Sequence, residues 1–206
     1  MSKPILYGHH ESGHSYKVRL ALVFLGIEHE YRYVDVMQPR EARRADFRAV
    51  SPYGEIPVLV EDGRALGQSD AILLHLARRT GRMGGEDLDL TAQWLFREAN
   101  RIGISLPNLR WEWHFMGSAD EGLLGWLRTR VEQDLADLEA ALAERPFLLG
   151  EELSVADLAH AGYLWFAEQA HVELGGYPNI RAWMGRIEGR RGWEHPYELL
   201  ARDAEG

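Results

Sequence analysis

The spacing of apolar positions changes character along the chain. In its first part, short apolar runs at residues 4–7, 30–36 and 58–60 carry the aromatic and β-branched side chains typical of strands. Between the first two runs, residues 16–26 show apolar positions at helical spacing, with Ser15 or a neighbour as the N-cap. The predicted order is strand, helix, strand, a short basic helix, then a strand pair and a further helix. Such a strand–helix–strand unit favours a parallel pair with a right-handed crossover.

The segment around the third run fixes the backbone with two prolines and a glycine. Residues 51–60 are Ser-Pro-Tyr-Gly-Glu-Ile-Pro-Val-Leu-Val. Pro57 lacks an N–H, so it begins the strand rather than lying within it. An Asp-Gly pair after the strand predicts a hairpin, and the polar pair Gln68-Ser69 then precedes an apolar helix over residues 70–79. The free N–H groups at the start of such a helix favour carboxylates.

Glycines gather in the segment after that helix and predict a linker. Beyond it strand signals nearly vanish, and all seven tryptophans lie there. Helical spacing predicts helices over residues 88–106, 120–144, 158–168 and 178–190. Pro107 is expected to kink or end the first of them.

Two patterns in this helical part have a structural interpretation. Ser154 and Asp157 match a capping box, which explains both polar residues without a catalytic role. The helix over residues 120–144 carries one apolar stripe with steps of three or four, which predicts a buried face. The stripe consists of Leu123, Leu127, Val131, Leu135, Leu138 and Leu142.

Composition narrows the class of protein. The 206 residues are 46% hydrophobic and 27% charged, as in ordinary globular proteins of one or two domains. No apolar run approaches the ~20 residues that a membrane helix needs, and no signal peptide is evident, so we expect a cytoplasmic protein. The net charge of −9 argues against nucleic acid as a partner. It is uneven, at +1 over residues 1–80 and −10 over the rest, so the first part is the better host for a small anionic ligand.

The chain has no cysteine. Disulfides, thiolate metal sites and a cysteine nucleophile are therefore excluded, and any thiol chemistry must use a thiol that the substrate brings. His9, His10 and His14 lack a carboxylate or cysteine partner at ligand spacing, so we predict no metal site. Ser12 with His14 does not define a hydrolase triad, because two-residue spacing fixes no geometry and no orienting acid is evident.

A resemblance to a known family rests on the stretch Pro-Tyr-Gly-Glu-Ile-Pro-Val-Leu followed by Gln-Ser-Asp-Ala-Ile. It looks like the glutathione-binding half of the cytosolic glutathione S-transferases, and the capping box and first helix also match this family. The resemblance implies a thioredoxin-like α/β N-terminal domain (residues 1–80), a linker (81–87) and an all-α C-terminal domain (88–206). It also implies glutathione as co-substrate, a small hydrophobic electrophile and a homodimer.

The same resemblance assigns the glutathione contacts. Pro57 is cis in the family, and the backbone of the residue before it, here Ile56, pairs with the cysteinyl part of glutathione. Gln68 and Ser69 correspond to the residues that hold the γ-glutamyl end. Near the glycyl end the family usually offers an amide, where this chain has Glu55, whose carboxylate would repel the ligand's own.

A basic neighbour is therefore needed to neutralise Glu55, unless its side chain points away. Arg40, Arg43 and Arg44 are the candidates. Serine-type relatives often place a basic contact at the position of Arg43, which is our predicted residue.

Thiol activation needs a hydrogen-bond donor near the start of the first helix, because only the thiolate is a good nucleophile. Ser12 stands six residues before Val18, as the catalytic serine does in serine-type (phi-, theta- or zeta-like) transferases. We therefore predict Ser12 as the donor. A purely capping Ser12, and Tyr7 or Ser15 as the donor, are the alternatives.

Aromatic residues after Pro107 suit a hydrophobic electrophile. Trp111, Trp113 and Phe115 are the predicted wall of that pocket, although packing in the core explains them equally well. Three functions stay open: a glutathione transferase, a non-catalytic glutathione- or protein-binding module of the same fold, and a glutathione-dependent isomerase or peroxidase.

Overall fold

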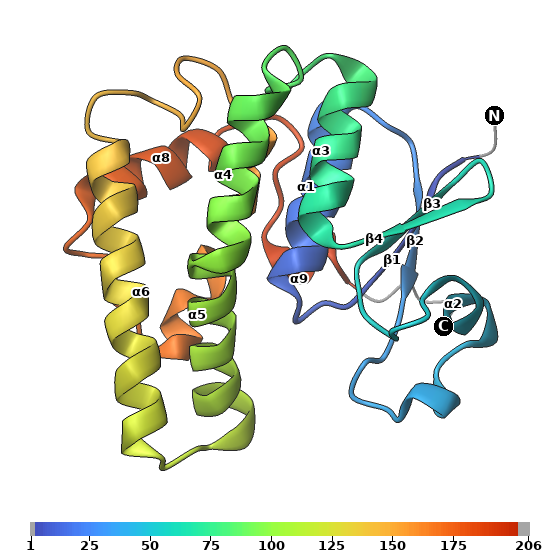
Figure 1. The fold of residues 1–206 in the computed structure, drawn as a ribbon, viewed down its shortest axis with the longest axis horizontal. Coiled ribbons are helices and arrows are strands. Elements are labelled where there is room, and N and C mark those ends of the chain that lie inside the picture. Colours follow the sequence, from blue (N-terminus) through green and yellow to red (C-terminus); the bar gives the residue numbers. More distant parts are fainter. Residues whose placement is uncertain (1–2, 202–206) are drawn as a thin grey trace.

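A four-stranded mixed sheet forms the N-terminal part of the molecule (Figure 1). The computed structural model describes residues 3–201. The strand order is β2-β1-β3-β4. Strand β1 pairs in parallel with β2 and antiparallel with β3, and β3 forms a hairpin with β4. The strands are β1 (Ile5–Gly8), β2 (Glu30–Tyr33), β3 (Val58–Glu61) and β4 (Arg64–Gly67).

Side chains of the central strands alternate between two apolar layers. Leu6 and Leu59 belong to the core that includes helices α1 (Gly13–Leu25) and α3 (Ser69–Thr80). Tyr7 belongs to a smaller cluster with the short helix α2 (Ala45–Val50) on the other face. This is the predicted thioredoxin-like arrangement.

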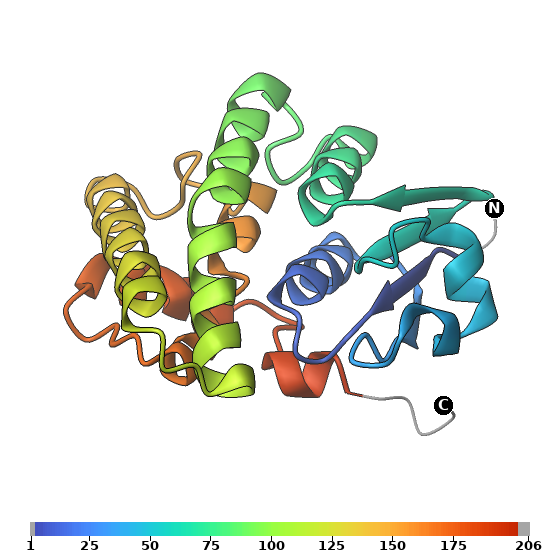
Figure 2. The same cartoon turned by 60° about the horizontal axis from the view of Figure 1, so that its bottom comes forward.

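The rest of the described chain is helical. Figures 1 and 2 show the helices of residues 88–188 to one side of the sheet, with α1 and α3 between. Among residues 3–201 no helix combines the length and apolar character needed to cross a bilayer. The remaining helical segments are η1 (Arg40–Ala42), α4 (Leu88–Asn100), α5 (Ile102–Arg110), η2 (Trp111–Met116), α6 (Glu121–Ala141), α7 (Val155–Ala161), η3 (Leu164–Ala170), α8 (Pro178–Glu188) and α9 (Pro196–Leu199).

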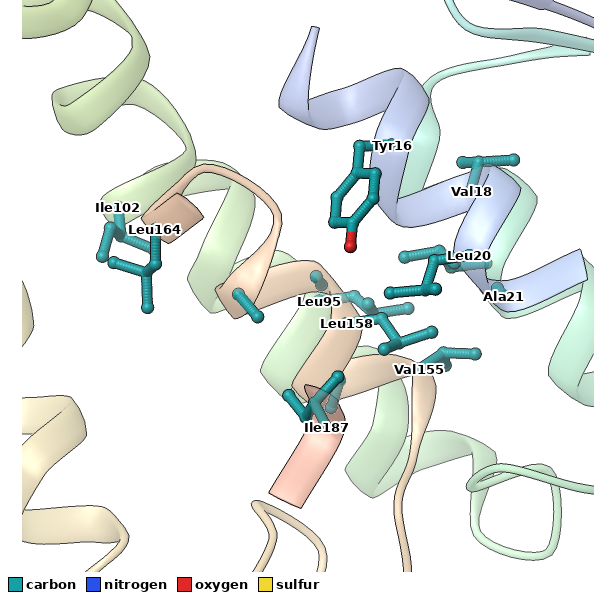
Figure 3. Close-up of a cluster of buried hydrophobic side chains, with 14 of the residues drawn as sticks. Tyr16, Val18, Leu20, Ala21, Leu95, Ile102, Val155, Leu158, Leu164 and Ile187 are labelled. Atoms are coloured by element: carbon teal, nitrogen blue, oxygen red, sulfur yellow. The ribbon is translucent and has the colours of Figure 1, made fainter. Parts of the chain in front are cut away.

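One apolar core runs from the sheet side into the helical part. Tyr16 and Leu20 of α1 lie in the same buried cluster as Leu95 of α4 and Leu158 of α7 (Figure 3). Helix α1 therefore packs against both the sheet and the C-terminal helices. This packing fixes the position of its N-terminus relative to α4 and α7.

Several predicted boundaries were wrong. The helix expected over residues 88–106 is broken at Arg101, where φ is −126° and ψ is −110°, and Pro107 lies inside the following helix without ending it. A proline removes only one helical hydrogen bond, and the chain continues as a π-helical turn in η2. The segment expected as one helix over 158–168 is instead α7 followed by the 3₁₀ helix η3.

Other expectations concern single side chains. Leu123, predicted in the buried stripe of α6, is 38% exposed, whereas its neighbour Leu124 is buried, so the core-facing side of the first turn is shifted by one residue from the prediction. The predicted capping contact is present, since the Asp157 carboxylate accepts the Ser154 N–H at 2.8 Å. The N-cap of α1 is Ser12 rather than Ser15, and the helix begins three residues earlier than predicted.

Candidate functional site

A cleft of about 990 Å³ lies between the loop before β3, the start of α3 and the helices α4 and α5. Four predicted glutathione contacts, Ile56, Pro57, Gln68 and Ser69, line it together. The Ile56–Pro57 peptide bond is cis, as the resemblance implied. The helical side of the cleft is mostly apolar and consists of Ala92, Leu95, Phe96, Glu98, Ala99, Gly103 and Ile104.

The start of α3 presents backbone donors to this cleft. Its first helical hydrogen bond runs from the Ile72 N–H to the Gln68 carbonyl, so the N–H groups of Ser69, Asp70 and Ala71 have no helical acceptor. Gln68 adopts a φ of +62°, which turns the chain sharply into the helix. The exposed N–H groups and the helix dipole together favour an anion here.

A buried ion cluster stands behind this helix start. The Lys17 ammonium, whose side chain is 0% exposed, lies 2.7 Å from the Asp70 carboxylate and 3.0 Å from that of Glu98. Burial raises the pKa of Glu98, and the neighbouring Asp70 carboxyl raises it further. Burial also opposes ionisation of Asp70, but the Lys17 ammonium lowers the pKa of that group overall. One ammonium thus joins α1, α3 and α4 between two carboxyl groups.

His14 links the cleft to the start of α1. It lines the cleft, and its Nδ1 lies 3.4 Å from the Ser69 Oγ. Its ring meets that of Tyr163 edge-on at 5.0 Å. Burial raises the pKa of Tyr163, and the Ser12 hydroxyl opposes this shift as a donor to the tyrosine oxygen. Burial lowers the pKa of His14 to about 3, with the Lys17 ammonium as the next cause.

Ser12 itself is not among the residues that line the cleft. Its Oγ accepts the Ser15 N–H at 3.1 Å, so it does cap the helix. The Ser15 hydroxyl accepts the His9 N–H at 3.4 Å. The Tyr7 hydroxyl donates to Asp46 and accepts from Arg32, on the α2 side of the sheet.

The loop before Ser12 is held from the helical side by Arg110, which is 2% exposed. Its guanidinium donates to the Glu11 backbone oxygen at 2.6 Å and pairs with the Glu11 carboxylate. It also packs against the rings of Phe115 and Phe166, at 5.1 and 4.1 Å from their centres. Tyr197 completes this network by donating to the Glu11 carboxylate at 2.8 Å.

The predicted aromatic wall lies on this side, outside the residues that line the cleft. Trp111 and Phe115 pack against each other with ring centres 5.1 Å apart, and Trp113 stacks on His171 at 4.6 Å. Trp111 is 41% exposed, so it is not a core residue. Through Phe115 and Arg110, the wall is connected to the Ser12 loop.

The basic residues before β3 differ in what they bind. Arg43 donates to three backbone carbonyl oxygens, those of Val36, Gln38 and Gly54. Arg44 pairs with Asp46. Within residues 3–201 the Arg40 side chain forms no hydrogen bond or ion pair, and its Nε would lie 3.0 Å from a Cβ placed on Gly54. Glu55 accepts the Gln68 side-chain amide at 3.0 Å at the cleft edge.

In the part of the chain that the structure describes, no group of three His, Asp or Glu side chains is arranged to hold a metal ion. The cleft combines a helix start, a cis-proline loop and a neutral histidine, and the Ser12 cap lies next to it, outside the lining residues.

Known proteins match this chain over nearly its whole length. Residues 11–79 match the model for the N-terminal domain of glutathione S-transferase, and residues 92–186 match that for its C-terminal domain. The chain belongs to the glutathione S-transferase family. A glutathione S-transferase F10 of Arabidopsis thaliana is 30% identical over 190 residues, covering 85% of this chain and 87% of the relative. A maleylacetoacetate isomerase of Pseudomonas aeruginosa is 28% identical over 192 residues, with coverage of 85% and 87%.

The fold of this family is also found among solved structures. A glutathione S-transferase of Pseudomonas fluorescens superposes with a TM-score of 0.81 at 32% identity, covering 92% of this chain and 96% of that one. Because the chain belongs to this transferase family, glutathione is the ligand that we compare with the groups in the cleft.

Sequence reasoning missed the cluster of Lys17, Asp70 and Glu98, and gave His14 no role in the ligand site. One signal was available for Lys17, because it lies three and four residues before Leu20 and Ala21 on the apolar face of the first helix. A lysine on such a face calls for buried carboxylate partners. No sequence signal identified which carboxylates those were.

Proposed function

We propose that this chain is a serine-type glutathione transferase that activates the glutathione thiol for attack on small hydrophobic electrophiles. The observation that carries the proposal is that Ile56, Pro57, Gln68 and Ser69 line one cleft, at the start of a helix with free N–H groups. Family membership supports glutathione as the ligand.

Each part of the tripeptide has a matching group. The γ-glutamyl carboxylate faces the backbone N–H groups at the start of α3, where a negative charge is stabilised. The γ-glutamyl ammonium faces the carboxyl groups of Asp70 and Glu98, which also line the cleft. The cysteinyl backbone pairs with Ile56 beside the cis-proline, as the resemblance implies.

The glycyl carboxylate needs a cation. Sequence reasoning proposed Arg43, which in the structure is engaged with backbone carbonyls. Arg40 is the guanidinium near Gly54 and Glu55 that has no side-chain partner among the described residues. We therefore propose that Arg40 meets the glycyl end, with Arg43 holding the loop that carries it.

Ser12 is the proposed donor to the thiolate. A serine oxygen accepts two hydrogen bonds and donates one. The Ser15 N–H uses one acceptor position. Because Ser12 acts as a donor towards the Tyr163 oxygen in the structure, the proposed role requires its proton to turn from Tyr163 to the sulfur when glutathione binds; that role is electrostatic rather than nucleophilic.

The proposed electrophile site is the aromatic wall of Trp111, Trp113 and Phe115, on the Ser12 side. Partly exposed rings suit a hydrophobic acceptor that approaches the sulfur from that side. A second candidate is a glutathione-dependent isomerase, which the maleylacetoacetate isomerase among the relatives favours. A binding module without turnover would use the same cleft.

We further propose the domain division at residues 81–87, a cytoplasmic location and a homodimer. Two large aromatic side chains on the cleft edge support the dimer, since Tyr53 is 69% and Phe96 71% exposed. Exposed aromatic side chains of this kind mark protein interfaces. Light scattering should then give about twice the chain mass of 23.5 kDa.

Replacing Ser12 by Ala tests the transferase proposal. Removing a hydrogen bond that is stronger to the thiolate than to the thiol should lower kcat for a model aryl halide by about a hundredfold or more. The affinity for glutathione should change little, because the γ-glutamyl and cysteinyl contacts remain. Equal rates for the variant and the parent protein would contradict Ser12 as the donor, and a parent protein that binds glutathione without turnover would favour the binding module.

A further inference from the structure

His14 occupies the position between the two halves of the site. It follows Ser12 by two residues on the first turn of α1, and it lines the same cleft as Ser69 at the start of α3. Ser12 and Ser69 are 57 residues apart in the sequence, and His14 is the cleft-lining residue on the same turn as Ser12.

Its two ring nitrogens have different surroundings. Nδ1 lies 3.4 Å from the Ser69 hydroxyl. Within residues 3–201 Nε2 has no hydrogen-bond partner. It is also not a buried atom, so a ligand can reach it. The side chain lines the cleft, and no protein atom competes with a ligand for this nitrogen among the described residues.

The ring is held in place from behind. Tyr163 packs edge-on against it, at 5.0 Å and an interplanar angle of 77°. The same tyrosine packs so closely on α1 that a Cβ at position 13 would lie 2.6 Å from a Tyr163 ring carbon and from the Gly162 carbonyl oxygen. A residue with a fixed ring and one unpartnered nitrogen is pre-organised for a specific contact.

We propose that His14 is a second donor to the glutathione sulfur, acting as a neutral imidazole beside the Ser12 hydroxyl. The inference rests on the proposed glutathione transferase function. The Ser69 hydroxyl donates to Nδ1 and so fixes the tautomer that carries a proton on Nε2, while the backbone N–H groups of α3 receive the γ-glutamyl carboxylate. Nε2–H then donates to the sulfur, and the thiol proton leaves to solvent.

The charge state of the ring agrees with this role. Burial lowers the pKa of His14 to about 3, so the ring is neutral at neutral pH and neither takes up the thiol proton nor titrates with it. The charged and titratable groups around it are Lys17 on α1, Asp70 on α3, Glu98 on α4 and Tyr163 after α7. Of these, the Lys17 ammonium favours a sulfur anion, whereas the Asp70 carboxylate opposes it, so a neutral donor at His14 adds directly to the stabilisation of the thiolate.

Two variants separate the donor from the ring. His14→Phe keeps the ring and its contact with Tyr163 but removes both nitrogens, whereas His14→Asn keeps a short side chain with an amide donor. His75→Phe is the matched control, since His75 lies on α3 outside the cleft lining and contacts Glu61. Circular dichroism and thermal unfolding establish that each variant is folded.

The readout is the pKa of bound glutathione, followed by the ultraviolet absorbance of its thiolate, together with glutathione affinity from calorimetry. We expect His14→Phe to raise that pKa by about one unit, which lowers the thiolate fraction about tenfold below the pKa. His14→Asn should recover a large part of the shift, and His75→Phe should give the value of the parent protein.

The outcomes distinguish two failures. A parent protein that binds no glutathione removes the proposed function and this inference with it. A parent protein that binds glutathione with a lowered thiol pKa, and a folded His14→Phe variant with the same pKa, overturns the role of His14 and leaves the proposed function standing.

Discussion

At the scale of single residues, one buried ammonium, that of Lys17, faces two carboxyl groups behind the cleft. The side chain of Lys17 is wholly buried, and it neutralises part of the charge of Asp70 and Glu98. Burying an unpaired charge is costly, so the cluster is stable only while one of the two carboxyl groups keeps its proton. The raised pKa of Glu98 and the lowered pKa of Asp70 assign that proton to Glu98.

This assignment predicts a pH dependence of stability. The pKa of Glu98 is higher in the folded protein than its ordinary value of 4.5, so above that value the unfolded chain loses the proton first. Loss of that proton makes the unfolded state more favourable, so the contribution of Glu98 to the stability of the folded protein falls as the pH rises through neutrality. Glu98→Gln mimics the protonated side chain, so the variant should become more stable relative to the parent protein between pH 6.5 and 8.

Urea unfolding at pH 6.5 and at pH 8 gives the free energy of unfolding of both proteins. Between the two pH values, we expect the difference between variant and parent to change by about 1.4 kcal/mol or more, which corresponds to one pKa unit. The window lies above the ordinary pKa of histidine, because the lowered pKa of His14 contributes a change of opposite sign at lower pH. Glu132→Gln, on the exposed face of α6, is the control. Parallel pH curves for Glu98→Gln and the parent protein would show that Glu98 is ionised in the folded state.

At the scale of elements, the first turn of α1 is fixed from two sides. The Arg110 network holds the preceding loop, and the end of α7 packs directly on Gly13. There is no room for a side chain at residue 13. The position of the Ser12 cap is therefore set by helix packing as well as by its own hydrogen bond.

A methyl group at this position should disturb both stability and catalysis. We expect Gly13→Ala to lower the free energy of unfolding by about 1–3 kcal/mol, the usual cost of overpacking. It should also lower kcat for a model electrophile, because the Ser12 turn moves. Gly125→Ala, in the second turn of α6 where a Cβ would meet nothing within 4 Å, should instead be neutral or stabilising by up to about 1 kcal/mol. Similar losses in both variants would refute a packing constraint specific to residue 13.

At the scale of the whole molecule, the sequence predicted the fold class well and the helix boundaries poorly. The strands and the hairpin follow from local residue chemistry, the cis bond before Pro57 followed from the family resemblance, and the structure contains all of them. The break at Arg101 and the continuation through Pro107 depend on packing between α5 and its neighbours, which no local pattern encodes.

In the site, too, local patterns were predicted from the sequence and long-range contacts were not. The residues around the cis-proline and the start of α3 are separated by a single short hairpin, so motif reasoning found them together, and the structure places them in one cleft. Contacts that join distant segments were not predictable: His14 with Ser69, Lys17 with Glu98, and Glu11 with Arg110. Partners this far apart are brought together only by the tertiary fold.

The central claim, that the cleft binds glutathione, is tested most directly by thermal unfolding of the whole chain with increasing reduced glutathione. A ligand that binds only the folded state stabilises it by about 2.7 kcal/mol at one hundred times its Kd. For a chain of this size that corresponds to a rise in Tm of roughly 5–10 °C. Such a rise is expected at millimolar glutathione and none with triglycine, whereas an unchanged Tm with glutathione would show that the cleft does not bind this tripeptide.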